Sequence, residues 1–529
     1  MAKKLNVLIF VIFSLINTYA DAGVRKQGAC EETVRALNGS LSPAWIKKML
    51  LALKPSSMSA EHLRDDVQKG GLNAVGLNPK IYNSHTDNYT WELPSLPISN
   101  QAQSGRCWDF SYELMISDQL LSPNYPFFYH LLEQGNNYFQ DVIENKTTGA
   151  IAPNISEGAW DEQFPYLMKN YGLVPYNLMP ETASSQNTRA MMAEIKQYLA
   201  EWAYKIESAK RKMLEDRVSD AKIVERLDAL KNTGLIGYSK LLATHLGTPP
   251  ALDKEFQFDL VGNPGSDGIG VHTPIQTKLY NPFAFAAAIT LFKPEDQVVI
   301  ASNPLRPEGF YKEIKSDAYR MSSDGSAKIL NVSMARLQQL TLTALLGGQR
   351  VRFDADVTHD VEYSKGIMHP DIYDDNVYDL KKSESPRPLN RVNSVRYYLA
   401  DPDHAMVKTA FHWPGLEKLV PKAWLESKGL KEEDRYKPGV AIIWLRERGI
   451  KPGDEKKILK TKVQNSWGTD VGTLGIFHDY QPWSSKYEFS ILVDKKFLSP
   501  EELGTWNFNK PTLLKEEFWS HDSDKKPQK

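Results

Sequence analysis

Cysteine is scarce in this sequence, since only Cys30 and Cys107 occur in 529 residues. Two thiols cannot build the disulfide framework on which small secreted domains depend, so a chain of this length must be stabilised by its apolar core. A basic surplus is also missing, because 64 Lys and Arg are balanced by 65 Asp and Glu. No general electrostatic attraction for nucleic acid follows from such a balance, and we expect no nucleic-acid partner.

Long apolar runs are equally rare, and the one that stands out lies at the start of the chain. Lys3 and Lys4 precede the apolar residues 5–16, and the small residues up to Ala22 fit a signal-peptidase cleavage site. The run is shorter than the about 20 residues that span a bilayer. Residues 1–22 are therefore predicted to be a signal peptide, with a retained anchor as the alternative. We expect an exported protein, periplasmic or secreted, without stable membrane insertion after cleavage.

Changes in composition divide the remaining chain into six regions. These are an N-terminal arm (23–95), a helical lobe with Cys107 (96–188), a helical insertion (189–246), a mixed strand and helix region (247–390), a β-rich lobe with His404 and Asn465 (391–498), and a C-terminal arm with a polar tail (499–529).

Residue spacing predicts the main elements of these regions. The insertion is free of proline and rich in helix formers, which predicts helices over Arg189–Glu215 and residues 219–230. Leucine spacing predicts a helix over residues 329–346, and alternation predicts a strand over residues 350–357. In the β-rich lobe, short β-branched or aromatic runs predict strands over residues 395–399, 406–412, 440–445, 458–464, 473–480 and 488–493.

Cys107 lies in the stretch Asn-Gln-Ala-Gln-Ser-Gly-Arg-Cys-Trp, residues 100–108. Gly105 marks a turn, and apolar residues recur at helical spacing from Trp108 onward, so Cys107 is predicted in the first turn of a buried helix. Unpaired N–H groups and the helix dipole favour a thiolate there. An isolated cysteine is more often a small buried hydrophobe, so further residues must decide.

Two later residues favour a catalytic cysteine. His404 lies in Asp-Pro-Asp-His-Ala-Met-Val, and Asn465 lies in Val-Gln-Asn-Ser-Trp-Gly. The order Cys, His, Asn, with long separations, is that of a papain-like thiol protease. Gln101, six positions before Cys107, has the offset expected of an oxyanion donor.

Several segments together resemble the bleomycin hydrolase (aminopeptidase C) family of papain-like cysteine peptidases. The resemblance runs from about residue 74 to residue 496 and rests on residues 100–108, 157–161, 171–185, 404–406 and 465–468. It implies an α+β, papain-like two-lobed fold, with a helical lobe, a β-barrel-like lobe, a helical insertion and terminal arms. It also implies a homohexamer with an internal chamber, peptide substrates, and a C-terminal arm that selects a free amino group.

The resemblance implies a role for each site residue. Cys107 and His404 form the thiolate–imidazolium pair, and Asn465 orients the ring. Gln101 and the Cys107 N–H hold the oxyanion. Trp108 and Trp467 support the site, and Trp467 shields the Asn–His contact. No cofactor and no metal are expected.

Some features leave alternatives open. The residues after 496 do not match the family, so an endopeptidase is the first alternative to an aminopeptidase. An inactive secreted binding or assembly protein and an acyl transferase are the others.

Asp109, in the first turn of the predicted helix, is expected to raise the thiol pKa. His412 is the second choice for the base, and the role of Cys30 stays open. Residues 359–375 gather histidines and acids without a fixed metal-ligand spacing, which favours a polar loop.

Overall fold

The computed structural model describes residues 41–71, 75–94, 96–146, 153–260, 276–291, 293–314, 321–322, 325–374, 389–397, 399–508, 510–514 and 518–519. The predicted signal peptide, residues 1–22, and Cys30 lie outside these residues. The described chain divides into two compact units, residues 41–71 and the rest. The first unit holds α2 (Pro43–Ala52) and α3 (Met58–Gly70), which the side chains of Ser42 and Ser57 cap.

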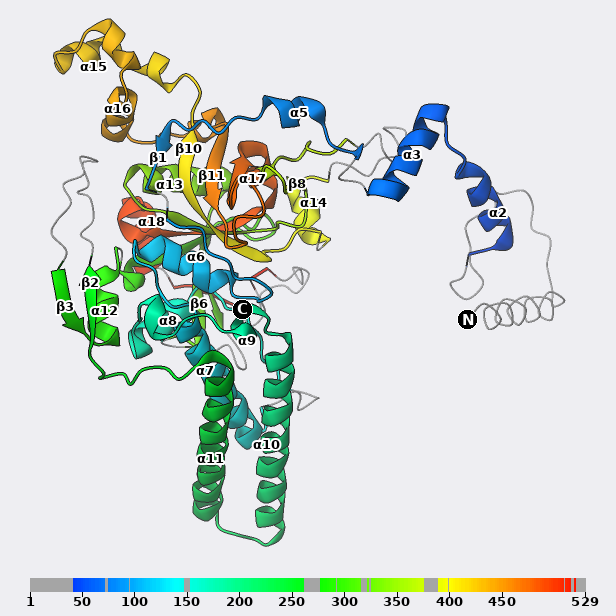
Figure 1. Ribbon diagram of the computed structural model, residues 1–529, viewed down its shortest axis with the longest axis vertical. Helices are drawn as coiled ribbons and strands as arrows, with labels where there is room; N and C mark the ends of the chain where they lie inside the picture. The colour runs from blue at the N-terminus through cyan, green and yellow to red at the C-terminus, as the bar shows by residue number, and fades with distance from the viewer. Residues whose placement is uncertain are drawn as a thin grey trace. The chain divides into compact units, whose positions relative to one another are not determined.

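A twelve-stranded mixed sheet, counted within the described residues, lies at the centre of the second unit (Figure 1). Its strand order is β14-β5-β6-β4-β13-β7-β10-β11-β12-β9-β8, and β1 pairs with β10. The strands are β1 (Trp91–Glu92), β4 (Gln297–Ala301), β5 (Gly309–Ile314), β6 (Ser326–Asn331), β7 (Val351–Ala355), β8 (Val361–Glu362), β9 (Ile367–Met368), β10 (His404–His412), β11 (Lys460–Gln464), β12 (Ile476–Tyr480), β13 (Glu488–Asp494) and β14 (Thr512–Leu514). A separate hairpin joins β2 (Phe256–Leu260) to β3 (Gln276–Tyr280).

The middle of this sheet is covered on both faces. Every residue of β13 and all but the last of β10 are buried, which requires cover on both sides because successive side chains point to opposite faces. The helix α6 (Cys107–Ile116) packs against β10 and β7. The helix α13 (Met334–Leu346) packs against β13, β10 and β7. Cys107 is therefore brought to the central strands by the burial of its own helix.

The helical lobe builds outward from α6. Its helices are α7 (Asn124–Glu144), α8 (Gln163–Tyr171), α9 (Ala183–Gln186), α10 (Arg189–Glu215), α11 (Asp220–Leu246) and α12 (Pro282–Ile289). The helices α10 and α11 run side by side as a long pair that projects from the lobe, and both contact α7 (Figure 1). Buried apolar residues such as Leu199 and Leu242 join the pair to one core with Trp108.

Six further α-helices belong to the described part of the second unit. They are α5 (Pro79–Ser84), α14 (Arg391–Arg396), α15 (Lys422–Ser427), α16 (Val440–Arg448), α17 (Gln481–Tyr487) and α18 (Pro500–Phe508). None of the helices in the described part of the chain combines the length and the apolar character that crossing a membrane requires.

Two predicted strands are wrong. Residues 395–399 overlap α14, whose first turn is capped by the Asn390 side chain. Residues 440–445 lie in α16, which is bounded by Gly439 and Gly449, both at positive φ. Short apolar runs suit either element, and here the two glycines decide, because they supply the left-handed conformation next to the helix ends.

Other boundaries differ in detail. The helix α10 has the predicted bounds, whereas α11 continues to Leu246, next to Gly247. Residues 329–346 were predicted to be one helix, but β6 ends at Asn331 and the Ser333 side chain caps α13. The strands β4 to β7, from the region predicted as mixed, belong to the same sheet as β10 and β11.

Candidate active site

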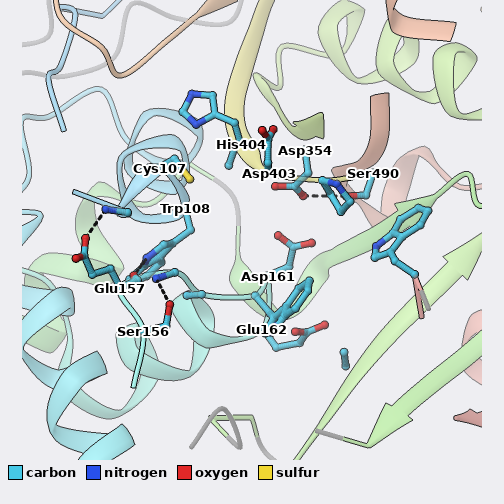
Figure 2. A pocket seen from close by; sticks show the side chains of 18 of the residues that line it. Cys107, Trp108, Ser156, Glu157, Asp161, Glu162, Asp354, Asp403, His404 and Ser490 are labelled. Carbon is cyan, nitrogen blue, oxygen red and sulfur yellow. Dashed lines mark hydrogen bonds between the residues drawn. The ribbon is translucent and has the colours of Figure 1, made fainter. Parts of the chain in front are cut away.

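Cys107 is the first residue of α6 and lines a cavity of about 1140 Å³ (Figure 2). The residue before it, Arg106, fixes the start of the helix. Its buried guanidinium donates to both carboxylate oxygens of Glu181, at 2.9 and 2.7 Å, and to the Asn124 Oδ1 and the Ser185 carbonyl. Bidentate pairs of this kind fix orientation as well as distance. The nucleophile thus starts from a rigidly held turn.

His404 begins β10 and faces the same cavity as Cys107 (Figure 2). Its Nε2–H donates to the Oδ1 of Asn465 at 2.8 Å, which leaves Nδ1 as the ring nitrogen available to the thiol. Asn465 directly follows β11, the neighbour of β10 in the sheet, and is 1% exposed. Its Oδ1 also accepts the backbone N–H of Ser466 at 2.7 Å. Both hydrogen bonds go to the same amide oxygen, which is the atom that orients the imidazole.

Trp467 packs on the His404 ring. The two rings stack with centroids 4.5 Å apart and planes 25° from parallel. Phe477, on β12, packs edge-on against Trp467 at 5.7 Å. Gly468 follows at a φ of +75°, and a Cβ there would lie 2.7 Å from the Nδ2 of Asn100. A glycine is required at this position because the two loops of the site approach so closely.

Gln101 is held at the cavity wall by the loop that contains Ser466. Its backbone N–H donates to the Ser466 carbonyl at 2.7 Å, and its Oε1 accepts the Ser466 hydroxyl at 2.6 Å. One Nε2 hydrogen is directed to the Ser104 carbonyl at 2.6 Å. The other hydrogen remains for a ligand in the cavity. The structure thus gathers Gln101, Cys107 and His404 on one cavity, with Asn465 behind the ring.

Burial shifts the ionisation of both reacting groups. It raises the pKa of the Cys107 thiol and lowers the pKa of His404, because each charged form loses water. A backbone hydrogen bond from Ala405 and the nearby Arg352 charge act to lower the thiol pKa, whereas Asp354 acts to raise it. When the proton moves from sulfur to imidazole, the two opposite charges that form stabilise each other.

Arg352 is a part of the site that the sequence analysis did not single out. It lies on β7, is 1% exposed, and forms ion pairs with Asp161 and, at 3.2 Å, with Asp354. Its Nε donates to the Ser111 hydroxyl on α6 at 3.0 Å, which ties the nucleophile helix to the sheet. Charged residues inside the run 350–357 are the one signal in the sequence, since a buried charge needs a partner.

The cavity wall carries a surplus of acids. Two cationic side chains, Arg352 and Lys196, line it together with six carboxylates, which are Glu157, Asp161, Glu162, Glu313, Asp354 and Asp403. In Figure 2, Glu157 lies on one side of the cavity, and Asp161, Glu162, Asp354 and Asp403 lie on the other. Asp403 directly precedes His404 in the sequence. Such a wall favours a cationic group of a ligand.

The remaining site expectations have mixed outcomes. Trp108 is buried against His130 and donates its Nε1–H to the Glu157 carbonyl at 2.8 Å. His412 contacts Thr90, at the end of β10 opposite His404. The expectation that Asp109 raises the thiol pKa is wrong, because the acid that does so is Asp354.

Asp109 is fully buried, and burial raises its own pKa well above the ordinary value. Glu113, Arg106 and Glu181 are the charged groups that act on it. The shift favours the neutral carboxyl, which places no negative charge near the sulfur. Within residues 359–374, the described part of that run, no side chain belongs to a three-ligand group that could hold a metal.

A helix that starts at a cysteine, across a cavity from a histidine oriented by an asparagine, defines a cysteine peptidase of papain-like fold. The chain belongs to the Peptidase C1-like family, whose model matches residues 51–429 and 447–519.

Its relatives are known peptidases. Aminopeptidase C of Lactobacillus delbrueckii subsp. lactis is 25% identical over 78% of this chain and 83% of its own length. Bleomycin hydrolase of Gallus gallus is 25% identical over 79% of this chain and 84% of its own length. The crystal structure of PepW from Lactobacillus rhamnosis has the same fold, with a TM-score of 0.70 and 23% identity over 90% of this chain and 98% of that one.

Proposed function

We propose that this chain is a cysteine aminopeptidase that hydrolyses peptide and related amide bonds through a Cys107 acyl-enzyme. The proposal rests on one observation. Cys107 and His404 line the same cavity, and Asn465 is hydrogen-bonded to the Nε2 of His404. The supporting relatives are named aminopeptidase C, aminopeptidase G and bleomycin hydrolase.

The proposed reaction uses these groups in order. The thiol proton moves to His404 Nδ1, and the thiolate attacks the scissile carbonyl carbon. The free Nε2 hydrogen of Gln101 and the backbone N–H of Cys107 donate to the oxyanion. The imidazolium then gives its proton to the leaving amine, and a water, deprotonated by the imidazole, hydrolyses the thioester. Asn465 keeps the ring in the one orientation that serves both half-reactions.

The acidic wall of the cavity supports selection of a free amino terminus. Four more carboxylates than cations line the space beside Cys107, and they attract the ammonium group of a substrate. An acetylated peptide has lost that charge. We therefore expect exopeptidase action, with endopeptidase action as the outcome to exclude.

Matched peptides with free and with acetylated N-termini test the selectivity. The free peptides should be cleaved from the amino end at least about tenfold faster, which corresponds to about 1.4 kcal/mol of differential binding in the transition state. Equal rates would show an endopeptidase. Cys107→Ser, purified alongside, should hydrolyse neither.

Iodoacetamide labelling separates the enzyme from an inactive binding protein. Peptide mapping after labelling should place the fast-reacting thiol at Cys107, and the rate should rise with pH. Failure of Cys107 to label in the folded chain would contradict the proposed role, because the thiolate is the nucleophile.

We also propose that the chain is exported and assembles as a homohexamer. Export is supported by residues 1–22, and N-terminal sequencing of the exported protein should begin at Gly23. Assembly is supported by the exposed apolar side chains Tyr204, Leu214, Val224 and Ile236 on α10 and α11. Light scattering should give about six times the mass of the mature chain, and Val224→Glu should lower it whereas Glu225→Gln should not. A monomeric wild-type chain would contradict the assembly.

A further inference from the structure

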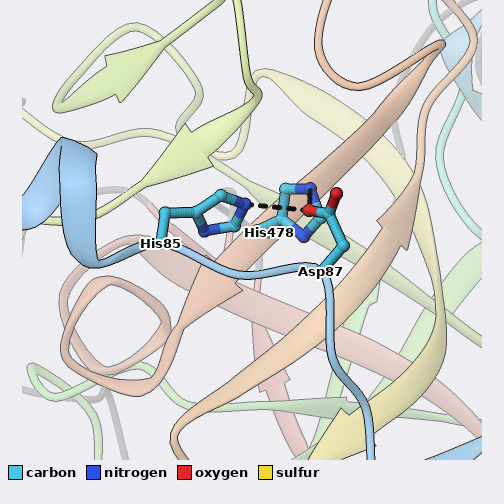
Figure 3. A group of neighbouring side chains, drawn as sticks. All are labelled: His85, Asp87 and His478. Atoms are coloured by element: carbon cyan, nitrogen blue, oxygen red, sulfur yellow. Dashed lines mark hydrogen bonds and ion pairs between the residues drawn. The ribbon is translucent and has the colours of Figure 1, made fainter.

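Two histidines and an aspartate that take no part in the proposed reaction meet at one point of the sheet (Figure 3). His85 and Asp87 lie between α5 and β1, whereas His478 lies on β12. The Oδ1 of Asp87 is 3.1 Å from the Nε2 of His85 and 3.3 Å from the Nε2 of His478. All three atoms lie within 4.8 Å of one another. The described residues contain no other group of this kind.

Tyrosine hydroxyls orient both rings toward this point. The Nδ1 of His85 is 3.0 Å from the hydroxyl of Tyr480, and the Nδ1 of His478 is 2.6 Å from the hydroxyl of Tyr89. With each Nδ1 engaged, the Nε2 of His85 is hydrogen-bonded to Asp87, and the Nε2 of His478 lies between the Asp87 oxygen and the Thr473 hydroxyl. Metal-bound histidines are held in the same way, by a hydrogen bond at the ring nitrogen that does not bind the metal.

Metals bind the neutral form of imidazole. Burial favours that form here, because it lowers the pKa of His478 to about 2 and also lowers the pKa of His85. The Asp87 side chain is 63% exposed, so an ion can reach the group from solvent.

From this geometry we propose that His85, Asp87 and His478 bind a divalent transition-metal ion, with Zn²⁺ as the reference ion. Two imidazole nitrogens and one carboxylate oxygen form a common ligand set for Zn²⁺, with bonds of about 2.0–2.2 Å. Two ligands on one tetrahedral ion are then about 3.3 Å apart. The separations of 3.1 and 3.3 Å from Asp87 have that size.

The tyrosines permit the change of tautomer that binding requires. Without the ion, each tyrosine hydroxyl donates to Nδ1, the Nε2–H of His85 donates to Asp87, and the Nε2–H of His478 donates to the Thr473 hydroxyl. With the ion, each Nδ1–H donates to the tyrosine oxygen, and each Nε2 lone pair binds the metal. A hydroxyl both donates and accepts, so neither state leaves a buried polar atom unpaired. Thr473, whose Oγ1 is 3.4 Å from the His478 Nε2, or a water completes the coordination.

Lysines around the group limit its affinity. Lys460 acts to lower the pKa of both histidines, Lys365 acts on His85, and Lys462 acts on His478. Like charge opposes a bound cation in the same way. We therefore expect a micromolar site rather than a nanomolar one.

The bound ion would connect the segment before β1 to β12. The strand β1 pairs with β10, the strand that begins with His404, and Phe477 beside His478 packs on Trp467. The ion thus stabilises the sheet behind the cavity, and the proposal does not depend on the peptidase reaction.

The test is Zn²⁺ titration of the full-length chain by calorimetry, in a Cys107→Ser background that removes the reactive thiol as a ligand. We expect one equivalent to bind, and saturation with zinc at about 100 times Kd to raise Tm by about 3 °C. Asp87→Asn and His85→Gln should weaken binding at least about tenfold, since each removes one ligand. Both substitutions lie at the edge of the group and leave the buried His478 in place.

His245→Gln is the matched control, because the Nε2 of His245 is also 3.0 Å from a carboxylate, that of Glu194. It should bind zinc as the parent does. Co²⁺ in place of zinc should give the visible absorption of a tetrahedral site, and Asp87→Asn should abolish it. Absence of stoichiometric zinc binding, or unchanged binding in Asp87→Asn, would overturn the proposal and leave a metal-free hydrogen-bond network.

Discussion

Replacing Asn465 by alanine tests the step from geometry to catalysis most directly. The substitution removes the 2.8 Å hydrogen bond that orients the His404 ring and leaves the buried Nε2–H without an acceptor. Such a loss costs about 1–3 kcal/mol. If that cost appears in the transition state, where the ring must be aligned, kcat falls by about 5- to 160-fold. The KM should change little, because Asn465 does not line the cavity.

The assay is steady-state hydrolysis of an aminoacyl arylamide, with circular dichroism to verify the fold. Asn465→Asp is the matched variant, because it keeps the acceptor and adds a negative charge beside the ring. That charge should raise the pKa of His404 and move the acid limb of the pH profile upward. A folded N465A with the wild-type kcat, or an N465D with an unmoved acid limb, would refute the orienting role.

Three further predictions concern the surrounding groups. Gln101→Ala should lower kcat by about 10²–10³, the loss expected for one oxyanion donor, whereas Ser466→Ala should cost much less; equal losses would indicate a structural role. Because burial lowers the pKa of His404 and raises that of Cys107, the pair keeps its single proton around neutral pH, and kcat/KM should be flat there and fall at both lower and higher pH. A profile without a plateau around neutral pH would contradict this. Arg352→Met should lower the free energy of unfolding by about 3–5 kcal/mol in urea titrations, because it leaves the half-buried carboxylates of Asp161 and Asp354 without their cation; a loss below about 1 kcal/mol would show that their other partners suffice.

Local pattern predicted the elements whose structure depends on local sequence. The start of α6 at Cys107 follows from the turn at Gly105 and the apolar spacing after it. The bounds of α10 follow from a proline-free run of helix formers. The prediction of a strand over residues 440–445 is wrong because six consecutive apolar residues suit a buried strand and a buried helix equally. Only the tertiary environment distinguishes the two.

Clusters that form through tertiary contacts were beyond the sequence analysis. Histidines and acids crowd residues 359–375 along the chain, yet the group that converges in space takes His85 and Asp87 from one segment and His478 from another. The charges in the run 350–357 indicated that Arg352 needs a partner but not which one, because Asp161 lies in a different region of the sequence. Proximity in sequence is a poor guide to such sites, since strand order decides which side chains meet.

Arg352 explains how an acidic cavity and a reactive thiol can share one wall. The carboxylates that attract a substrate ammonium also disfavour a thiolate, and Asp354 does act to raise the pKa of Cys107. The guanidinium pairs with Asp161 and Asp354, and its charge acts on the sulfur in the opposite direction. Because it also donates to Ser111 on α6, the same side chain fixes the distance between the acids and the nucleophile helix. Selection of a cationic substrate and activation of the thiol are therefore balanced by one buried arginine.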